Sequence, residues 1–279
     1  MTPPGQPTIV GIPYDASSSY LRGAAGAPPL IRSALASASS NSWSESLRDI
    51  GQPDALADAG DIDLSGHDPR QAIERGARDS IKNGQRPISL GGDHSITYPL
   101  LRAFREVHPR LTVLHIDAHS DLYEEFEGDR YSHACPFARI MEEGLADGLV
   151  QVGIRTLSAH QRAQANRYAV EVIDMRAWVA GARPQVGGPV YVSLDLDALD
   201  PAYAPGVSHW EPGGLTVREV ITVVQQLGGT LIGADIVEYN PVRDPTGVTA
   251  MVAAKLVKEI ASRMLEDSTR SSTTQAQPA

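Results

Sequence analysis

Eight short apolar segments recur along the 279-residue chain, and stretches with helical periodicity separate most of them. Many of the segments are β-branched and apolar on both faces, which is typical of strands buried in a parallel sheet. The expected strands are Thr8–Ile12, Ala57–Gly60, Pro87–Leu90, Leu111–Ile116, Leu149–Gly153, Val170–Ile173, Val190–Leu194 and Leu231–Ile236. The expected helices are Pro28–Ala38, Arg70–Asn83, Ser95–His108, Pro136–Glu143, Ser158–Arg167, Val217–Gln226 and Val248–Leu265. This alternation predicts an α/β fold with three layers, α/β/α, around an eight-stranded, mainly parallel sheet.

The chain length suits one large α/β domain. We find no internal repeat and no linker that would divide it. The last residues are rich in Ser, Thr, Gln and Pro, a composition that does not support a packed core. We therefore expect a single domain over residues 1–266 and a disordered tail over residues 267–279.

The composition excludes several classes of protein. A net charge of −10, from 34 acidic and 24 basic residues, disfavours nonspecific nucleic-acid binding. No run of 18 apolar residues is long enough to cross a membrane, and the start of the chain does not resemble a signal peptide. Cys135 is the one cysteine, so an intrachain disulfide framework is excluded. A single cysteine fits a reducing compartment, and we expect a cytoplasmic protein.

Polar side chains follow four of the expected strands at the point where each strand ends. His94 lies in a Gly-Gly-Asp-His run after the third strand, and Glu238 follows the last one. Two further strands end in acidic and histidine residues, namely Asp117, His119 and Asp121, and Asp195 and Asp197. The carboxyl ends of parallel strands share one edge of a sheet, where ligand sites collect. We therefore expect these side chains to meet.

The spacing of these residues predicts a metal centre. In a strand, alternate side chains point to the same side, so Asp117, His119 and Asp121 can converge, as can Asp195 and Asp197. Buried carboxylates need cationic partners, and mixed imidazole and carboxylate ligands suit Mn²⁺ or another transition metal. Two cations about 3.5–4 Å apart can activate a shared water. A single ion would leave Asp121 and His94 without a role.

Four motifs together resemble the ureohydrolases, the arginase and agmatinase family. They are Gly-Gly-Asp-His at 91–94, Asp-Ala-His-Ser-Asp at 117–121, Ser-Leu-Asp-Leu-Asp-Ala-Leu-Asp-Pro at 193–201 and Asp-Ile-Val-Glu-Tyr-Asn-Pro at 235–241. The resemblance covers nearly the whole chain. It implies an arginase/deacetylase-like fold, two Mn²⁺ ions per chain and a trimer or hexamer. By the same resemblance one ion would be held by His94, Asp117, Asp121 and Asp195, and the other by Asp117, His119, Asp195 and Asp197.

The reaction implied by the resemblance is hydrolysis of a guanidino or formimino group. We expect Asp121 to take a proton from the attacking water and pass it on. The resemblance assigns His133 to proton shuttling or substrate contact, although Ala134 stands where family members often have Gly. Glu238 would pair with the planar guanidinium through two parallel hydrogen bonds.

The substrate tail depends on two loops. Residues 122–130 carry four acids where arginases hold the α-carboxylate of arginine, which favours a cationic tail such as that of agmatine. Arg130 could still bind a carboxylate, as in a guanidino acid or formiminoglutamate. In the second loop, residues 204–214, His209 and Trp210 could form a pocket wall. We favour an agmatinase-like hydrolase that releases urea, with formimidoylglutamase or another guanidino-acid hydrolase as the alternative and arginase as the less favoured one.

Two rival interpretations remain. A zinc deacetylase on a related fold would generally need one ion and a histidine pair beside it, so metal counting separates it. A catalytically silent binding or regulatory subunit would be expected to have lost ligands, whereas all six candidate ligands and Glu238 are present.

Overall fold

The computed structural model describes residues 5–66 and 68–275, which form one eight-stranded sheet. The strands are β1 (Pro7–Gly11), β2 (Ala57–Asp61), β3 (Arg86–Leu90), β4 (Thr112–Ile116), β5 (Gly148–Ile154), β6 (Glu171–Asp174), β7 (Pro189–Asp195) and β8 (Thr230–Val237). Their spatial order is β2-β1-β3-β8-β7-β4-β5-β6, and every pairing between them is parallel. The eight predicted strands and the predicted fold class are confirmed.

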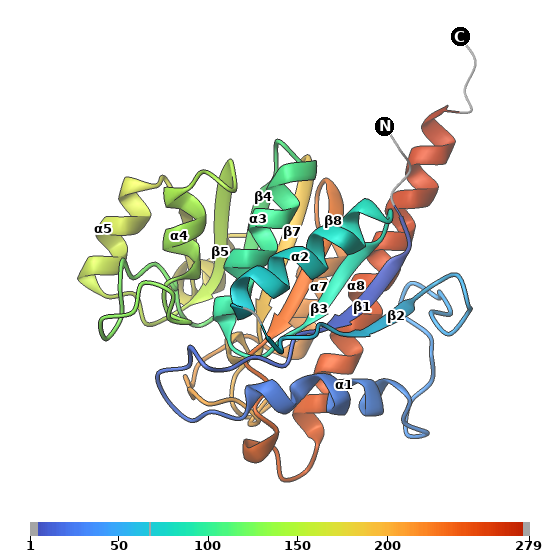
Figure 1. Cartoon of the computed structure of the whole chain (residues 1–279), viewed down its shortest axis with the longest axis horizontal. Helices are drawn as coiled ribbons and strands as arrows, with labels where there is room; N and C mark the ends of the chain where they lie inside the picture. The colour runs from blue at the N-terminus through green and yellow to red at the C-terminus, as the bar shows by residue number, and fades with distance from the viewer. Residues whose placement is uncertain (1–4, 67, 276–279) are drawn as a thin grey trace.

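Helices cover both faces of the sheet (Figure 1). In the orientation of Figure 1, α2 (Pro69–Lys82) and α3 (Thr97–Val107) lie in front of the strands and α8 (Val248–Gln275) lies behind them. The buried apolar residues form two clusters, one on each face. The remaining helices are α1 (Ala27–Leu35), α4 (Pro136–Glu142), α5 (Ala159–Arg167), α6 (Met175–Val179) and α7 (Val217–Gln225), and four 3₁₀ turns are η1 (Ala24–Gly26), η2 (His94–Ile96), η3 (Leu196–Ala198) and η4 (Pro241–Arg243).

Helix α6 was not predicted. It has five residues, too few for a helical pattern of apolar residues to be recognised. The Asp174 side chain caps it by accepting a hydrogen bond from the Ala177 backbone, and Trp178 is buried against the sheet. A capping residue and one buried aromatic side chain are the signals that could have revealed it.

The C-terminal boundary differs from the expectation. Helix α8 continues to Gln275, so the structure is helical over much of the segment that was expected to be disordered. Asp267 is buried, pairs with Arg263 and accepts a hydrogen bond from the Leu231 backbone at the start of β8. Its side chain therefore belongs to the folded domain, and the expected boundary at residue 266 lies too early. Residues 276–279 lie outside the described part of the chain.

The sheet order brings together the four strands that carry the candidate site residues. β3, β8, β7 and β4 are consecutive neighbours in the middle of the sheet. Their registers align Leu90 with Ile236, Asp195 with Val237, and Ile116 with Leu194. The residues that follow these strands therefore emerge side by side at one edge.

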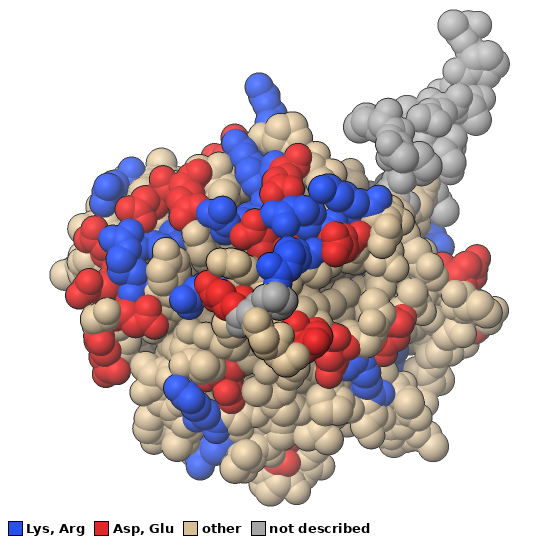
Figure 2. Space-filling view, in the orientation of Figure 1, with Lys and Arg blue, Asp and Glu red and all other residues tan. Residues whose placement is uncertain are grey.

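The surface and the helices agree with the composition. Figure 2 shows acidic and basic side chains intermingled on the face that carries α2 and α3, with no large area of one sign. Many of these charges form ion pairs, including those of Arg78 and Arg102 with Glu74. Within residues 5–66 and 68–275, no helix is both long and apolar enough to cross a membrane.

Candidate metal centre

The Gly-Gly-Asp-His run bends sharply after β3. A Cβ atom on Gly92 would lie 1.6 Å from the carbonyl oxygen of Tyr14, so only glycine fits against this neighbouring segment. Asp93 is fully buried and accepts hydrogen bonds from the backbone of Ser17 and Ser95. These contacts fix the start of η2, whose first residue is His94.

Two residues of the site have strained backbones. Asp121 and Glu238 have φ values of 48° and 63°, in the left-handed region that non-glycine residues rarely adopt. Strain of this kind persists where the surrounding structure enforces it, and it is found most often at functional sites. The two residues follow β4 and β8, so the strain coincides with the edge where the candidate residues gather.

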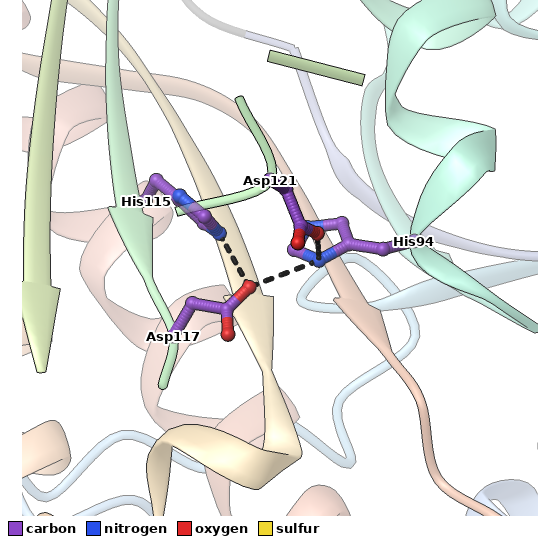
Figure 3. Close-up of side chains that lie close together, drawn as sticks. All are labelled: His94, His115, Asp117 and Asp121. Carbon is purple, nitrogen blue, oxygen red and sulfur yellow. Dashed lines mark hydrogen bonds and ion pairs between the residues drawn. The ribbon is translucent and has the colours of Figure 1, made fainter. Parts of the chain in front are cut away.

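His94 lies at the centre of three carboxylates. Its Nδ1 atom is 3.2 Å from Asp117 Oδ2, 3.1 Å from Asp121 Oδ2 and 3.2 Å from Asp195 Oδ2. In Figure 3 the side chains of His94, Asp117 and Asp121 point toward one another, and a dashed line joins His115 to Asp117. The side chains of the four residues drawn in Figure 3 are all buried. Three acceptors around one nitrogen mark the place where a cation would bind.

The other nitrogen of His94 determines its tautomer. Ser193 Oγ donates its one proton to Asp235 Oδ1 at 2.7 Å, so it accepts at 2.9 Å from His94 Nε2. The proton of a neutral His94 is then on Nε2, and Nδ1 carries a lone pair. Nδ1 is buried and makes no hydrogen bond within the described residues. An unpaired buried acceptor is costly, and a metal ion at this position would satisfy it.

His115 orients Asp117, one of the candidate metal ligands. The Gln151 amide nitrogen lies 3.0 Å from His115 Nδ1 and 2.6 Å from the Ser120 carbonyl oxygen. His115 therefore accepts at Nδ1 and donates from Nε2 to Asp117 Oδ2, 2.7 Å away. Asp117 is oriented by this bond and by the His119 backbone N–H, 2.6 Å from Oδ1.

His119 and Asp197 form the second half of the centre. His119 Nδ1 lies 3.0 Å from Asp197 Oδ2 and 3.5 Å from Asp117 Oδ1. His119 is more exposed than His94, with 24% of its side chain accessible. Its outer nitrogen, Nε2, faces Glu211 Oε1 at 3.6 Å.

The pKa shifts of residues in the centre indicate that it needs added positive charge. Burial raises the pKa of the Asp195 carboxyl well above its ordinary value, and the Asp197 and Asp117 carboxylates raise it further. Burial opposes a charged His94, yet the three carboxylates around it raise the pKa of this imidazole well above its ordinary value. Both shifts show that clustered, desolvated anions need a cation. Asp117 is common to the two clusters of possible ligands, and Asp195 lies 3.2 Å from His94 of the first cluster. A donor set of four carboxylates and two imidazoles fits a pair of divalent metal ions.

A second pair of residues lies beside the metal ligands. His133 Nδ1 is 3.0 Å from Glu238 Oε1, which also accepts a hydrogen bond from the His94 backbone at 2.9 Å. His133 Nε2 lies 2.8 Å from Ser19 Oγ. Burial disfavours the imidazolium, but the Glu238 carboxylate outweighs it and raises the pKa of His133 to about 9.

Four of the six ligands and this pair line one cavity of about 240 Å³, whereas His94 and Asp117 lie buried behind its wall. Its wall includes His119, Asp121, His133, Asp195, Asp197 and Glu238, together with Ser19, Tyr123, Phe126, Ala134, Thr156, Gln161 and His209. His209 lies between the rings of His133 and His119, at centroid distances of 5.3 and 5.8 Å. Burial lowers the pKa of His209, and the cationic His133 lowers it further.

Two residues expected to contact the substrate lie elsewhere. Arg130 is exposed and pairs with Glu142 at 2.9 Å, and it does not line the cavity. Trp210 is half exposed and stacks under Arg243, 4.4 Å from the ring centroid. The four acids of the 122–130 loop are also exposed and absent from the cavity wall. The loop charge that favoured a cationic tail therefore faces solvent.

His115 and Asp93 were predicted from the sequence to orient the ligands, but other residues around the centre were missed. Ser193 and Asp235 lie inside strands, where alternating polar residues on an otherwise apolar face were the available signal. Glu211 and Arg155 come from segments whose approach to His119 and to the Asp197 turn depends on tertiary structure alone.

Comparison with known proteins gives one consistent result. The family model described as "Arginase family" matches residues 6–262. Arginase 1, mitochondrial, of Arabidopsis thaliana is 44% identical over 278 residues, which cover 92% of this chain and 80% of that protein.

Solved structures agree with the sequence comparison. Arginase from Medicago truncatula superposes with a TM-score of 0.89 at 43% identity, covering 94% of this chain and 88% of that one. A hypothetical agmatinase from Burkholderia thailandensis superposes with a TM-score of 0.85 at 30% identity, covering 96% and 87% of the two chains.

Proposed function

The chain belongs to the arginase family of metal-dependent ureohydrolases, and from that premise we propose that it hydrolyses the guanidino group of L-arginine to urea and ornithine. The observation that carries the proposal is a cavity whose wall combines four of the metal ligands, the His133–Glu238 pair and several neutral polar side chains. The enzyme class, a hydrolase of guanidino C–N bonds, follows from the family.

Two Mn²⁺ ions are proposed as the cofactor. The ligands would be His94, Asp117, Asp121 and Asp195 for one ion and Asp117, His119, Asp195 and Asp197 for the other. When bound, such a pair supplies Lewis acidity and a water that ionises near neutral pH. The carboxylate-rich donor set supports manganese over zinc.

Glu238 anchors the substrate in this proposal. Its Oε1 atom already accepts hydrogen bonds from His94 and His133. Within the described residues no hydrogen bond is made by Oε2, which is available for the guanidinium. A carboxylate and a planar guanidinium form strong, directional hydrogen bonds, which would hold the central carbon in place for attack.

Asp121 and His133 move protons. Asp121 accepts the proton lost by the attacking water, because its carboxylate faces both the cavity and His94. His133 is protonated at neutral pH, since the Glu238 carboxylate raises its pKa to about 9. It donates a proton to the departing amine nitrogen, which could not otherwise leave as a neutral amine.

The cavity wall supports an amino-acid tail. Ser19, Tyr123, Thr156 and Gln161 carry neutral donors and acceptors that can bind both an α-carboxylate and an α-ammonium group. The acids of the 122–130 loop, which would repel the carboxylate, lie outside the cavity. The resemblance to two plant proteins named as arginases points the same way.

Agmatine is the second candidate. Among the described residues that line the cavity there is no Lys or Arg to pair with an α-carboxylate. A substrate without an α-carboxylate does not need such a cation, so the lack of Lys and Arg would not weaken its binding. The agmatinase-like specificity favoured by the sequence therefore remains a specific alternative.

One experiment decides between these substrates. The protein is loaded with Mn²⁺, and product release is measured with L-arginine, agmatine, 3-guanidinopropionate, 4-guanidinobutyrate and formiminoglutamate. We expect the highest kcat/KM with L-arginine. A preference for agmatine of tenfold or more would overturn the arginine assignment, and two bound ions without turnover on any of the five would indicate a silent scaffold.

Assembly and location are also proposals. We infer a homo-oligomer, a trimer or hexamer, from the resemblance to ureohydrolases, and light scattering after gel filtration tests it. A cytoplasmic location is inferred from the single, buried cysteine. Relatives named as mitochondrial make fractionation of the source cells the appropriate test.

A further inference from the structure

Arg155 makes an unusual set of contacts between β5 and the metal centre. Its guanidinium donates to the carbonyl oxygen of Glu211 from Nε at 2.8 Å and to that of Asp197 from Nη2 at 2.7 Å. Further bonds reach the carbonyl oxygens of Gly153 and Ala198, each at 3.2 Å. Within the described residues, all of its hydrogen-bond acceptors are backbone carbonyl oxygens. A cation with five donors in a rigid fork is thus used to join three backbone segments.

Two of the joined segments matter for the chemistry. The first is η3, the turn that carries Asp197 and follows Asp195. The second is the 204–214 loop, which carries His209 in the cavity wall and Glu211 beside His119. Gly214 closes this loop, and a Cβ atom there would lie 2.7 Å from Arg155 Nη2. The loop sequence therefore leaves room for this guanidinium.

Glu211 occupies the outer side of His119. His119 turns Nδ1 toward Asp197 and Asp117, and Nε2 toward the Glu211 carboxylate at 3.6 Å. This separation is a charge contact, longer than a hydrogen bond. A carboxylate on the far nitrogen of a metal-binding histidine holds the proton there, which leaves the near nitrogen free for the metal.

We propose that Arg155 and Glu211 are positioning residues that fasten the 204–214 loop to the His119 half of the metal centre. Arg155 holds the Glu211 backbone against the Asp197 turn, and the Glu211 carboxylate orients the His119 ring. Metal occupancy and loop order are then linked, so each stabilises the other. The inference rests on the two-ion centre described above and is independent of which guanidino compound is the substrate.

The test uses two conservative variants with matched controls. Glu211→Gln keeps the shape but removes the charge, and Glu124→Gln makes the same change on an exposed acid outside the cavity. Arg155→Lys keeps the charge but loses the fork. Arg183→Lys is its control, because Arg183 also donates to backbone carbonyl oxygens but packs against Trp178 and does not line the cavity.

Manganese titration of the metal-free protein is the first measurement. We expect Glu211→Gln and Arg155→Lys to weaken one of the two ions by about 10-fold or more, the usual effect of removing an outer partner of a metal ligand. The electron paramagnetic resonance spectrum should show more isolated and fewer spin-coupled Mn²⁺ ions at equal loading. The melting temperature of metal-free Glu211→Gln should match that of wild type, which separates positioning from general destabilisation.

Hydrogen exchange of peptides from residues 204–214 is the second measurement. In wild type, exchange should slow when Mn²⁺ is added, and in Arg155→Lys most of this slowing should be lost. Equal affinities and equal exchange in the variants and their controls would overturn the proposal. So would an equal weakening of both ions accompanied by a lower melting temperature of metal-free Glu211→Gln. None of these readouts uses a substrate, so an incorrect substrate assignment leaves them unaffected.

Discussion

The two halves of the metal centre are built differently. His94 is fully buried, and its outer nitrogen binds Ser193, which in turn binds Asp235 inside the sheet. His119 is partly exposed, and its outer nitrogen faces Glu211 on a surface loop. The outer contact of His94 is therefore held by strands in the middle of the sheet, whereas that of His119 comes from a loop that also forms part of the cavity wall. In the second half, the orientation of the metal ligand and the shape of the cavity depend on the same loop.

Substitution of a residue assigned to both halves should lower the catalytic rate most. Asp195 faces His94 Nδ1 through Oδ2 and accepts the Asp197 backbone N–H at 2.7 Å through Oδ1. We expect Asp195→Asn to lower kcat by at least about 10³-fold, equivalent to about 4 kcal/mol, because it removes a ligand assigned to both ions. Urea release and atomic spectroscopy of bound manganese measure it, with Asp147→Asn on the exposed Arg105 pair as control. Two tightly bound ions in an active variant would rule out the shared role.

Asp121 belongs to the His94 half alone and should rank second. Asp121→Asn should keep the fold and the ion on the His119 side, and it should lower kcat by about 10²–10⁴-fold through loss of the proton acceptor. Asp129→Asn, an exposed residue of the same segment outside the cavity, is the matched control. Unchanged turnover in Asp121→Asn would refute the assigned role.

Substitution of Ser193 tests the His94 half, because Ser193 is the hydrogen-bond partner of the outer nitrogen of His94. Ser193→Ala leaves His94 Nε2 without an acceptor and Asp235 Oδ1 without this donor. We expect manganese affinity to fall by about 10-fold and the free energy of unfolding of the metal-free protein to fall by about 1–3 kcal/mol. Urea denaturation measures the second effect. No loss of stability is expected for Glu211→Gln, which changes the outer contact of the other half. Equal stability of metal-free Ser193→Ala and wild type would therefore contradict the proposed difference between the two halves.

The ion pair of His133 with Glu238 should contribute to the free energy of unfolding in a way that depends on pH. Its pKa in the folded protein, about 9, lies above the ordinary value of 6.5 because of Glu238. The pair therefore contributes stability that is fully present below pH 6.5 and is lost as pH rises through about 9. The difference in unfolding free energy between wild type and His133→Gln should narrow between pH 7 and pH 10. A difference that stays constant over this range would contradict the charged pair.

Much of this centre was predictable because the ligands occur in local patterns. Asp117, His119 and Asp121 share one strand end, as do Asp195 and Asp197, and strand periodicity alone suggests that each group converges. Where the four strands lie relative to one another was not predictable from local patterns. The insertion of β8 between β3 and β7 is a property of the whole sheet, and it brings Glu238 to His94 and His133.

The less predictable contacts come from loops. Arg130 looked like a substrate residue because a cation near a predicted active site is suggestive, but Glu142 on α4 pairs with it at the surface. Arg155 gave no such signal, because its partners are backbone carbonyl oxygens that carry no sequence signature. Helix α8 extended past the expected boundary because buried Asp267 contacts Arg263 and β8, a contact that composition does not reveal.

The position of β8 has a consequence for how the protein matures. On the ribosome β3, β4 and β7 emerge before β8, yet β8 is the strand that separates and joins β3 and β7 in the finished sheet. Until it inserts, His94 and Asp195 belong to parts of the chain that no ladder of backbone hydrogen bonds connects. A nascent chain truncated before residue 230 therefore has all six ligands but not the frame that assembles them. We therefore expect the centre to capture its metal ions late, after the chain has been completed and folded.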